Sequence, residues 1–183
     1  MKSATYIALV RGINVGGKNM LRMSALTRMF DDAGCADVRT YIQSGNVVFT
    51  ATAACAKRLA DDIAQAVEKR FGFRPGVVLR TADEIADAAA DNPLVGEGAD
   101  ERLLHVAFLA EEPDARRVAA LNPARSPGDS FKVRGREVYL YLANGAGKTK
   151  LSNAYLESTL GTTSTMRNWR TVLKLSEMAQ QLR

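Results

Sequence analysis

The residues best suited to chemistry lie in one loop, Arg11–Asn19, which reads RGINVGGKN and follows an apolar run. Gly16 and Gly17 can adopt positive φ, which allows successive backbone N–H groups to point into one hollow. Arg11 and Lys18 can neutralise an anion there. The alternative is that the glycines only let the chain turn tightly and that both cations are solvated. The loop therefore predicts either a phosphate or carboxylate site, or a plain turn.

A second loop, Asn144–Lys150, contains the tripeptide Gly-Lys-Thr. A Walker A motif needs a glycine five residues before the glycine of that tripeptide, and position 142 is leucine. The loop is therefore not a phosphate-binding loop of that class. Lys148 and Lys150 remain candidate ligands for an anion, with backbone N–H groups exposed at the glycines.

A third group of cations lies near the end of the chain. A helical pattern over 166–182, with Thr165 as its N-cap, places Arg167, Arg170 and Lys174 on one stripe opposite an apolar face. Such a stripe is usually a solvated helix face. Arg167 and Arg170 are nevertheless candidate binding residues, because they lie in the more basic part of the chain.

The expected hairpin Phe131–Leu142 alternates between apolar and polar positions. Lys132, Arg134, Tyr139 and Tyr141 fall on one face, and aromatics mixed with cations on an open sheet suit base stacking and phosphate contact. The same pattern is expected of any half-exposed hairpin. It therefore predicts either a nucleic-acid surface or ordinary cross-strand pairing.

No catalytic constellation can be recognised. His105 lies between apolar neighbours, as a core or edge histidine does, and Ser44 lacks the pattern of a nucleophile elbow. Cys35 and Cys55 lack metal-binding spacing and are expected to be reduced structural thiols. We expect no metal site, and the sequence identifies no cofactor.

Length, charge and hydropathy bound the class of protein. The 183 residues, 46% of them hydrophobic, are enough for a packed core. The net charge is +5; residues 1–100 carry 12 basic and 12 acidic side chains and residues 101–183 carry 13 and 8. An anionic small molecule or a nucleic acid is therefore a candidate partner. No apolar run approaches the roughly 20 residues of a membrane helix, so we expect a cytoplasmic protein without a membrane partner.

The elements that position these residues follow a recurring order. A strand at 6–10, a helix after Ser24, strands at 38–43 and 47–49, a helix around 55–67 and a strand at 77–80 give β-α-β-β-α-β. Thr81 and Glu84 then form a capping box. The pattern recurs with a strand at 103–109, a helix from Pro113, strands at 130–134 and 137–142, and a helix from Leu151. The predicted fold is α+β: two tandem ferredoxin-like halves (1–92 and 101–183) with antiparallel or mixed sheets and a C-terminal helix.

Five blocks of the sequence resemble the signature of a bacterial family, domain of unknown function 1697. The blocks are 11–19, 39–49, 91–93, 148–152 and 167–169. The resemblance implies a cytosolic α+β protein of two ferredoxin-like halves, and it brings no activity and no catalytic residue. Because loop positions of this kind are seldom dictated by packing, it favours an anion site at the first loop. Asn14, Ser44 and Asn46 would complete that site if the turn at 44–46 lies beside the loop.

Three classes of function follow. The first is a protein that binds a phosphate-bearing or other anionic ligand (a nucleotide, a metabolite or a nucleic acid) at the first loop. The second is an enzyme that acts on an anionic substrate there without a recognisable catalytic motif. The third is a protein-interaction module that uses the face with Tyr139 and Tyr141 or a free sheet edge.

Overall fold

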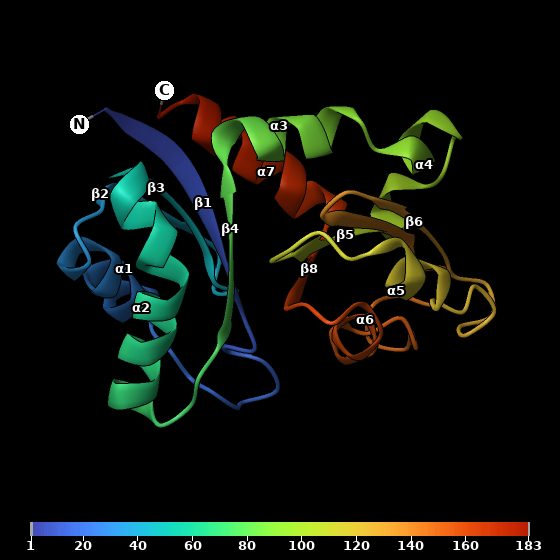
Figure 1. Ribbon diagram of the computed structural model, residues 1–183, viewed down its shortest axis with the longest axis horizontal. Coiled ribbons are helices and arrows are strands. Elements are labelled where there is room, and N and C mark those ends of the chain that lie inside the picture. Colours follow the sequence, from blue (N-terminus) through green and yellow to red (C-terminus); the bar gives the residue numbers. More distant parts are fainter. Residues whose placement is uncertain (1, 183) are drawn as a thin grey trace. The chain divides into compact units, whose positions relative to one another are not determined.

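The computed structural model describes residues 2–182 (Figure 1). The fold is α+β, with two four-stranded antiparallel sheets and a C-terminal helix, α7 (Trp169–Gln180). The chain divides into two compact units. Unit 1 runs to Asp87 and resumes at Lys174, and unit 2 is Ala88–Leu173. Helix α7 therefore begins in unit 2 and ends in unit 1, a division that the predicted halves, 1–92 and 101–183, do not have.

Unit 1 contains one sheet and two long helices. Its elements are β1 (Ser3–Arg11), α1 (Met23–Asp32), β2 (Ala36–Tyr41), β3 (Asn46–Thr52), α2 (Ala53–Phe71), β4 (Gly76–Thr81) and the start of α3 (Ala82–Ala90). The strand order is β2-β3-β1-β4, and β1 is antiparallel to both of its neighbours. The predicted element order of this part of the chain is confirmed.

The core of unit 1 forms around β1, whose apolar run is buried on both faces, as predicted. Ala8 and Val10 face α1 and α2, which lie on the same side of the sheet (Figure 1). The rings of Phe30 in α1 and Phe49 in β3 meet there, with centroids 5.1 Å apart. The loops at the ends of the sheet are therefore attached to a well-packed core.

Unit 2 repeats this order with shorter helices. Its elements are the rest of α3, α4 (Pro93–Gly96), a 3-10 turn (Glu101–Leu103), β5 (Leu104–Leu109), α5 (Ala115–Ala119), β6 (Ser130–Arg134), β7 (Glu137–Tyr141), α6 (Asn153–Leu160), β8 (Ser164–Asn168) and the start of α7. The strand order is β6-β7-β5-β8. Leu156 and Leu160 of α6 pack with Val138 and Leu140 of β7 in its core.

Helix starts were predicted with mixed success. The capping box at α3 is confirmed: Thr81 N–H donates to Glu84 Oε2 at 2.8 Å, and Glu84 N–H donates to Thr81 Oγ1 at 3.2 Å. The prediction for Ser24 is wrong, because Arg22 holds the N-cap position of α1. The prediction for Pro113 is wrong too, because the carboxylate of Asp114 caps α5.

Strand β8 was hidden within a predicted helix. Residues 164–168 pair with β5, with Val106 opposite Arg167, and α7 begins only at Trp169. Asn168 caps α7 by accepting from Thr171 N–H at 2.9 Å, so the prediction of Thr165 as the cap is wrong. The apolar spacing of α7 continues into the strand, and pairing with β5 overrides the local helical pattern.

Candidate ligand-binding site

The first loop closes on itself through backbone hydrogen bonds. Asn14 N–H donates to the carbonyl of Asn19 at 3.1 Å, and Lys18 N–H donates to the carbonyl of Val15 at 3.0 Å. Gly16 and Gly17, with φ of 57° and 74°, are the two central residues of this tight turn. Their positive φ, as predicted, forms this turn, and a role of the two glycines in binding an anion stays a prediction.

Asn14 braces the loop from inside. Its Oδ1 accepts from Leu21 N–H at 2.8 Å, and its Nδ2 donates to the carbonyls of Leu21 at 2.8 Å and Gln43 at 2.9 Å. The bond to Gln43 joins the first loop to the turn between β2 and β3. The two segments therefore lie side by side, which is the arrangement that the predicted site requires.

The turn itself is held by Ser44, Gly45 and Asn46. Asn46 is fully buried, and its Nδ2 donates to Ser44 Oγ at 2.9 Å and to the carbonyl of Tyr41 at 3.2 Å. Val10 N–H donates to the carbonyl of Gly45 at 2.8 Å, and a Cβ at Gly45 would lie 2.5 Å from the carbonyl oxygen of Val10. Ser44 and Asn46 therefore hold the turn beside the first loop through hydrogen bonds within the protein.

A hollow of about 810 Å³ opens beside this junction, within unit 1. The loop, the start of α1, the turn after β2 and the end of α2 all contribute to its lining. The side chains that matter for binding are Asn14, Met20, Arg22, Gln43, Arg70 and Phe71. Arg11 and Lys18 do not line it: Arg11 is half-buried at the end of β1, and Lys18 is exposed in the turn.

The electrostatics of the hollow favour an anion. Within residues 2–182, neither Arg22 nor Arg70 forms an ion pair. Arg22 also stands at the N-cap of α1 without a side-chain hydrogen bond, and the first turn of α1 has no acidic residue. An uncapped helix N-terminus carries a partial positive charge and unsatisfied N–H groups, which add to the two guanidinium charges.

Exposed apolar side chains gather at the same end of unit 1. Val15 is 67% exposed, Met20 66%, Ile42 53% and Phe71 36%. Ile42 also has φ of 50°, which is an uncommon and strained conformation for a β-branched residue. Met20 and Phe71 line the hollow itself. The hollow therefore combines two cations with apolar walls.

Sequence reasoning missed Arg22, Arg70 and Phe71. Arg70 and Phe71 form the end of α2, which reads in sequence as an ordinary helix terminus with basic residues. The guanidinium carbon of Arg70 lies 5.7 Å from the centre of the Phe71 ring. The phenylalanine directly before Gly72, the C-cap of α2, was the available signal in the sequence, and only the fold brings it near the first loop.

The loop that carries Lys148 and Lys150 encloses a carboxylate of the protein. Asp129 is buried, and its Oδ2 accepts from Ser126 Oγ at 2.7 Å. Burial raises the pKa of its carboxyl, but the neighbouring polar groups of Thr149 and Ser126 and the backbone of Asn144 and Ala143 outweigh burial and hold that pKa below its usual value. Lys148 N–H and Thr149 N–H both donate to the carbonyl of Gly145. An internal anion thus occupies this loop, and the lysines point outward as exposed residues.

Arg167 and Arg170 do not form the predicted stripe. Arg167 belongs to β8, is 9% exposed, and donates to Thr165 Oγ1 at 2.7 Å and to the carbonyl of Met166 at 2.9 Å. Burial lowers the pKa of Arg167 to about 10. Arg170 is exposed in α7. The stripe is therefore a wrong prediction, because the first of its members is a buried strand residue.

The hairpin face with Tyr139 is closed. The predicted sharing of one face is confirmed by the register, in which Lys132 lies opposite Tyr139 and Ser130 opposite Tyr141. Tyr139 is only 3% exposed, its hydroxyl donates to the carbonyl of Ala88 at 3.4 Å, and Lys132 pairs with Glu97. Base stacking and partner docking on Tyr139 are therefore wrong predictions, because the segment from Ala88 to Glu97 covers it.

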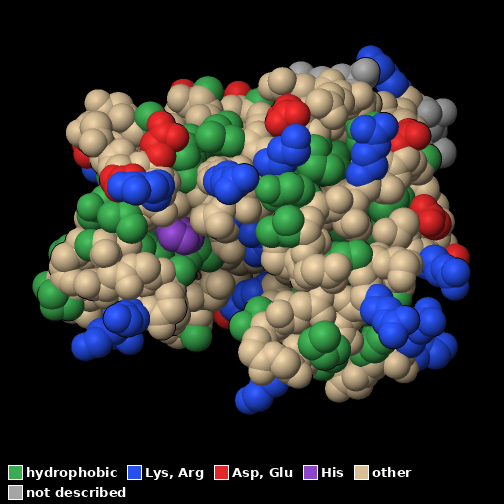
Figure 2. Space-filling model, turned by 180° about the vertical axis from the view of Figure 1, so that it is seen from behind, with side chains coloured by type: hydrophobic (Ala, Val, Ile, Leu, Met, Phe, Trp, Pro, Cys, Tyr) green, Lys and Arg blue, Asp and Glu red, His purple; other side chains and the backbone are tan. Residues whose placement is uncertain are grey.

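Metal and acid–base groups are sparse in the described part of the chain. Residues 2–182 hold no cluster of three or more His, Cys, Asp or Glu side chains able to bind a metal ion. Burial lowers the pKa of His105, whose Nδ1 lies 3.2 Å from the carbonyl of Leu103. On the face shown in Figure 2, Lys and Arg side chains lie in several separate groups. None of the helices described is long and apolar enough to cross a bilayer.

Comparisons with known proteins agree with this architecture. The chain is similar in structure to the conserved bacterial protein SP0830 from Streptococcus pneumoniae, with a TM-score of 0.72 and 24% sequence identity over 97% of this chain and 99% of that chain. This likeness concerns the fold alone. No curated protein matches the chain. The family model described as "Protein of unknown function (DUF1697)" matches residues 3–139, and the chain belongs to that family.

Proposed function

We propose that the protein binds a small ligand that carries a phosphate or another anionic group, in the hollow between the first loop and the end of α2. The observation that carries this proposal is the pairing of Arg22 and Arg70, two arginines without ion pairs among the described residues, around one apolar hollow. Guanidinium groups bind phosphate oxygens through charge-assisted, often bidentate hydrogen bonds. The site predicted at the loop thus moves to the space beside it.

The walls of the hollow support a ligand with a flat or apolar part. Met20 and Phe71 offer a thioether and an aromatic ring, which pack well against a ring system. Gln43 offers a carboxamide for a polar edge. The volume of about 810 Å³ lies in the range of small-molecule sites. We therefore propose a nucleotide or a phosphorylated metabolite of similar size, bound with its anionic group near Arg22.

Binding of a nucleotide to purified protein tests this function. We expect AMP to bind with measurable heat in isothermal titration calorimetry, adenosine to bind at least about tenfold more weakly, and raised salt to weaken AMP binding. Arg22→Ala and Arg70→Ala should each weaken AMP binding by about tenfold or more, because each removes a charge-assisted contact. Lys18→Ala should have a smaller effect, since Lys18 lies outside the hollow.

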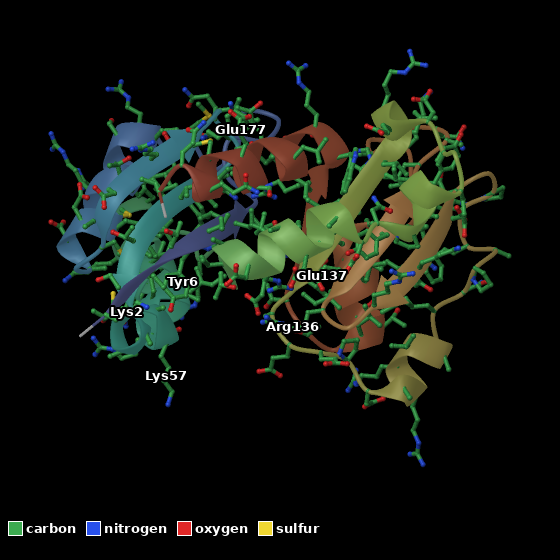
Figure 3. The ribbon with its side chains drawn as sticks, turned by 90° about the horizontal axis from the view of Figure 1, so that it is seen from above. Lys2, Tyr6, Lys57, Arg136, Glu137 and Glu177 are labelled. Atoms are coloured by element: carbon green, nitrogen blue, oxygen red, sulfur yellow. The ribbon has the colours of Figure 1, made fainter. Side chains whose placement is uncertain are left out.

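The matched control is Arg58→Ala. Arg58 is an exposed arginine of the same helix, α2, twelve residues before Arg70, or about 18 Å along the helix axis. It lies next to Lys57, whose side chain extends away from the ribbon in Figure 3. If Arg58→Ala and Arg70→Ala weaken AMP binding equally, the effect comes from the overall positive charge and not from a contact in the hollow. No binding across AMP, pyrophosphate and phosphorylated sugars would overturn the proposal.

One observation favours protein interaction as a second candidate. Val15 and Ile42 are exposed apolar residues outside the hollow, and exposed apolar clusters commonly mark contact surfaces. A stoichiometric protein partner that is lost in the double variant Val15→Ser and Ile42→Ser, with no nucleotide binding, would support it. The residues that line the hollow offer no carboxylate, histidine or thiol in the described chain, so an enzyme would need a group from its substrate.

We also propose the finer description of the fold and of the location. In unit 1, β1 lies between β3 and β4, and in unit 2, β5 lies between β7 and β8. Together with the β-α-β-β-α-β element order, this supports a ferredoxin-like description of each half. The two free cysteines support a reducing compartment such as the cytoplasm.

A further inference from the structure

Two cysteines that lie twenty residues apart in the sequence come together at one corner of unit 1. Cys35 directly precedes β2, and Cys55 lies in the first turn of α2. The thiol of Cys55 donates to the carbonyl of Ala33 at 3.3 Å, two residues before Cys35. The pairing of Ala36 in β2 with Thr50 in β3 also brings the chain leaving α1 beside the chain entering α2. Both side chains belong to the same apolar cluster.

The two thiols also interact with each other. The pKa of Cys35 is raised to about 12; burial is the largest cause, and the charge and hydrogen bonding of the neighbouring Cys55 contribute to the same shift. Cys35 is 8% exposed, whereas Cys55 is half-buried. Cys55 is therefore the more exposed residue of the pair and Cys35 the shielded one, which is the arrangement of an attacking thiol with a resolving thiol.

We propose that Cys35 and Cys55 are a modification site that forms an intramolecular disulfide by exchange with a small-molecule disulfide. In the first step the thiolate of Cys55 attacks one sulfur of the reagent, which forms a mixed disulfide on Cys55 and releases one small thiolate. In the second step Cys35 loses its proton as it attacks the sulfur of Cys55, which forms the Cys35–Cys55 bond and releases the second small thiol. The protein dithiol is oxidised by two electrons, and the reagent is reduced to two thiols.

The order of the steps follows from burial. A reagent reaches Cys55 first, because Cys35 lies within the core. The high pKa of Cys35 makes the second step the slower one at neutral pH, since the attacking species is the thiolate. The bond would tie the end of α1 to the start of α2, and the oxidised protein should unfold at a higher temperature, because the cross-link restricts the unfolded chain.

The test uses oxidised glutathione and the full chain. We expect the intact mass of the wild-type protein to fall by two hydrogens after a transient glutathione adduct, and peptide mapping to recover a Cys35–Cys55 cross-linked pair. Cys35→Ser should stop at a stable adduct on Cys55, and Cys55→Ser should gain no adduct. Circular dichroism checks that each variant is folded. If a variant does not fold, peptide mapping of the wild-type protein alone decides whether the Cys35–Cys55 bond forms.

Two results would overturn the inference. One is a wild-type protein that keeps a glutathione adduct on Cys55 without an internal bond, since the sulfurs would then be too far apart. The other is a protein whose thiols both remain free for alkylation after the treatment, since the pair would then be an inert part of the core.

Discussion

At the scale of single residues, the first loop and the neighbouring turn consist of polar side chains that hold the protein's own backbone. Asn14, Asn19 and Asn46 donate to carbonyls in or directly beside these two segments, those of Gln43, Gly12 and Tyr41 respectively. In sequence such residues are indistinguishable from ligand-binding residues, because both roles need carboxamides in loops. Arg22 and Arg70, which we propose bind the ligand, lie beside these hydrogen-bonded segments and line the hollow.

Asn14 provides the first prediction. Asn14→Ala removes three hydrogen bonds of about 1 kcal/mol each and forces alanine into φ of 54°, so the free energy of unfolding should fall by about 2–4 kcal/mol. Asn14→Gly loses the same bonds without the backbone penalty and should recover about 1 kcal/mol. Urea denaturation measures both. A loss below about 0.5 kcal/mol for alanine would contradict the bracing role.

Gly45 and Gly72 form a matched pair for the second prediction. Their φ values are 76° and 77°, but a Cβ at Gly45 meets the backbone of Val10, whereas a Cβ at Gly72 meets nothing within 4 Å. Gly72→Ala should cost about 1 kcal/mol, and Gly45→Ala about 3 kcal/mol or more, because the clash adds to the strain. Thermal and urea unfolding compare them. Equal costs would mean that the turn is free to move away from β1.

At the scale of elements, residue patterns predicted most strands and helices but misplaced several ends. The capping box of Thr81 was readable because both partners lie within one turn of sequence. Strand β8 could not be predicted from the sequence, because Arg167 and Trp169 continue a helical spacing. Only the pairing with β5 makes 164–168 a strand. Arg167, predicted to lie on the basic face of a helix as a candidate binding residue, is buried for the same reason.

The start of α7 gives the third prediction. Asn168→Ala removes the side chain that accepts from Thr171 N–H, and it should lower the free energy of unfolding by about 1 kcal/mol. Asn168→Asp keeps an acceptor oxygen and should change it by only a few tenths of that amount. Chemical denaturation of the two variants checks the assignment. An alanine variant as stable as the aspartate variant would place the helix start elsewhere.

The fourth prediction concerns the loop of Lys148 and its internal anion, Asp129. Because the folded pKa of Asp129 lies below the ordinary 3.8, the carboxylate stabilises the fold at neutral pH, and this contribution disappears as the pH falls through 3.8 toward the folded value. The wild type should therefore exceed Asp129→Asn in stability above about pH 5, with a shrinking difference in more acid solution. Urea unfolding from pH 7 to pH 3 measures this, and a constant difference would contradict it.

At the scale of the whole molecule, the class and the repeating element order followed from hydrophobic periodicity, and the family followed from the loop blocks. The hollow could not be predicted from the sequence, because Arg22, Gln43 and Arg70 come from three segments that only the fold of unit 1 brings together. The sequence indicated the segments beside the proposed site, through Asn14 and the turn at Gly45. It did not indicate Arg22 and Arg70, and a binding role for Lys18 and Lys148, which stand in glycine-rich loops, stays a prediction.

The most direct test of the proposed site is a residue-by-residue map of binding. Two-dimensional ¹H–¹⁵N spectra of the full chain, titrated with AMP and separately with pyrophosphate, report which backbone amides sense the ligand. We predict that the largest saturable shifts fall on the amides of 14, 20–25, 43 and 70–72, with small changes at 148–150 and 167–170. Shifts concentrated at 148–150 and 167–170, or none that saturate, would contradict a binding site in the hollow of unit 1.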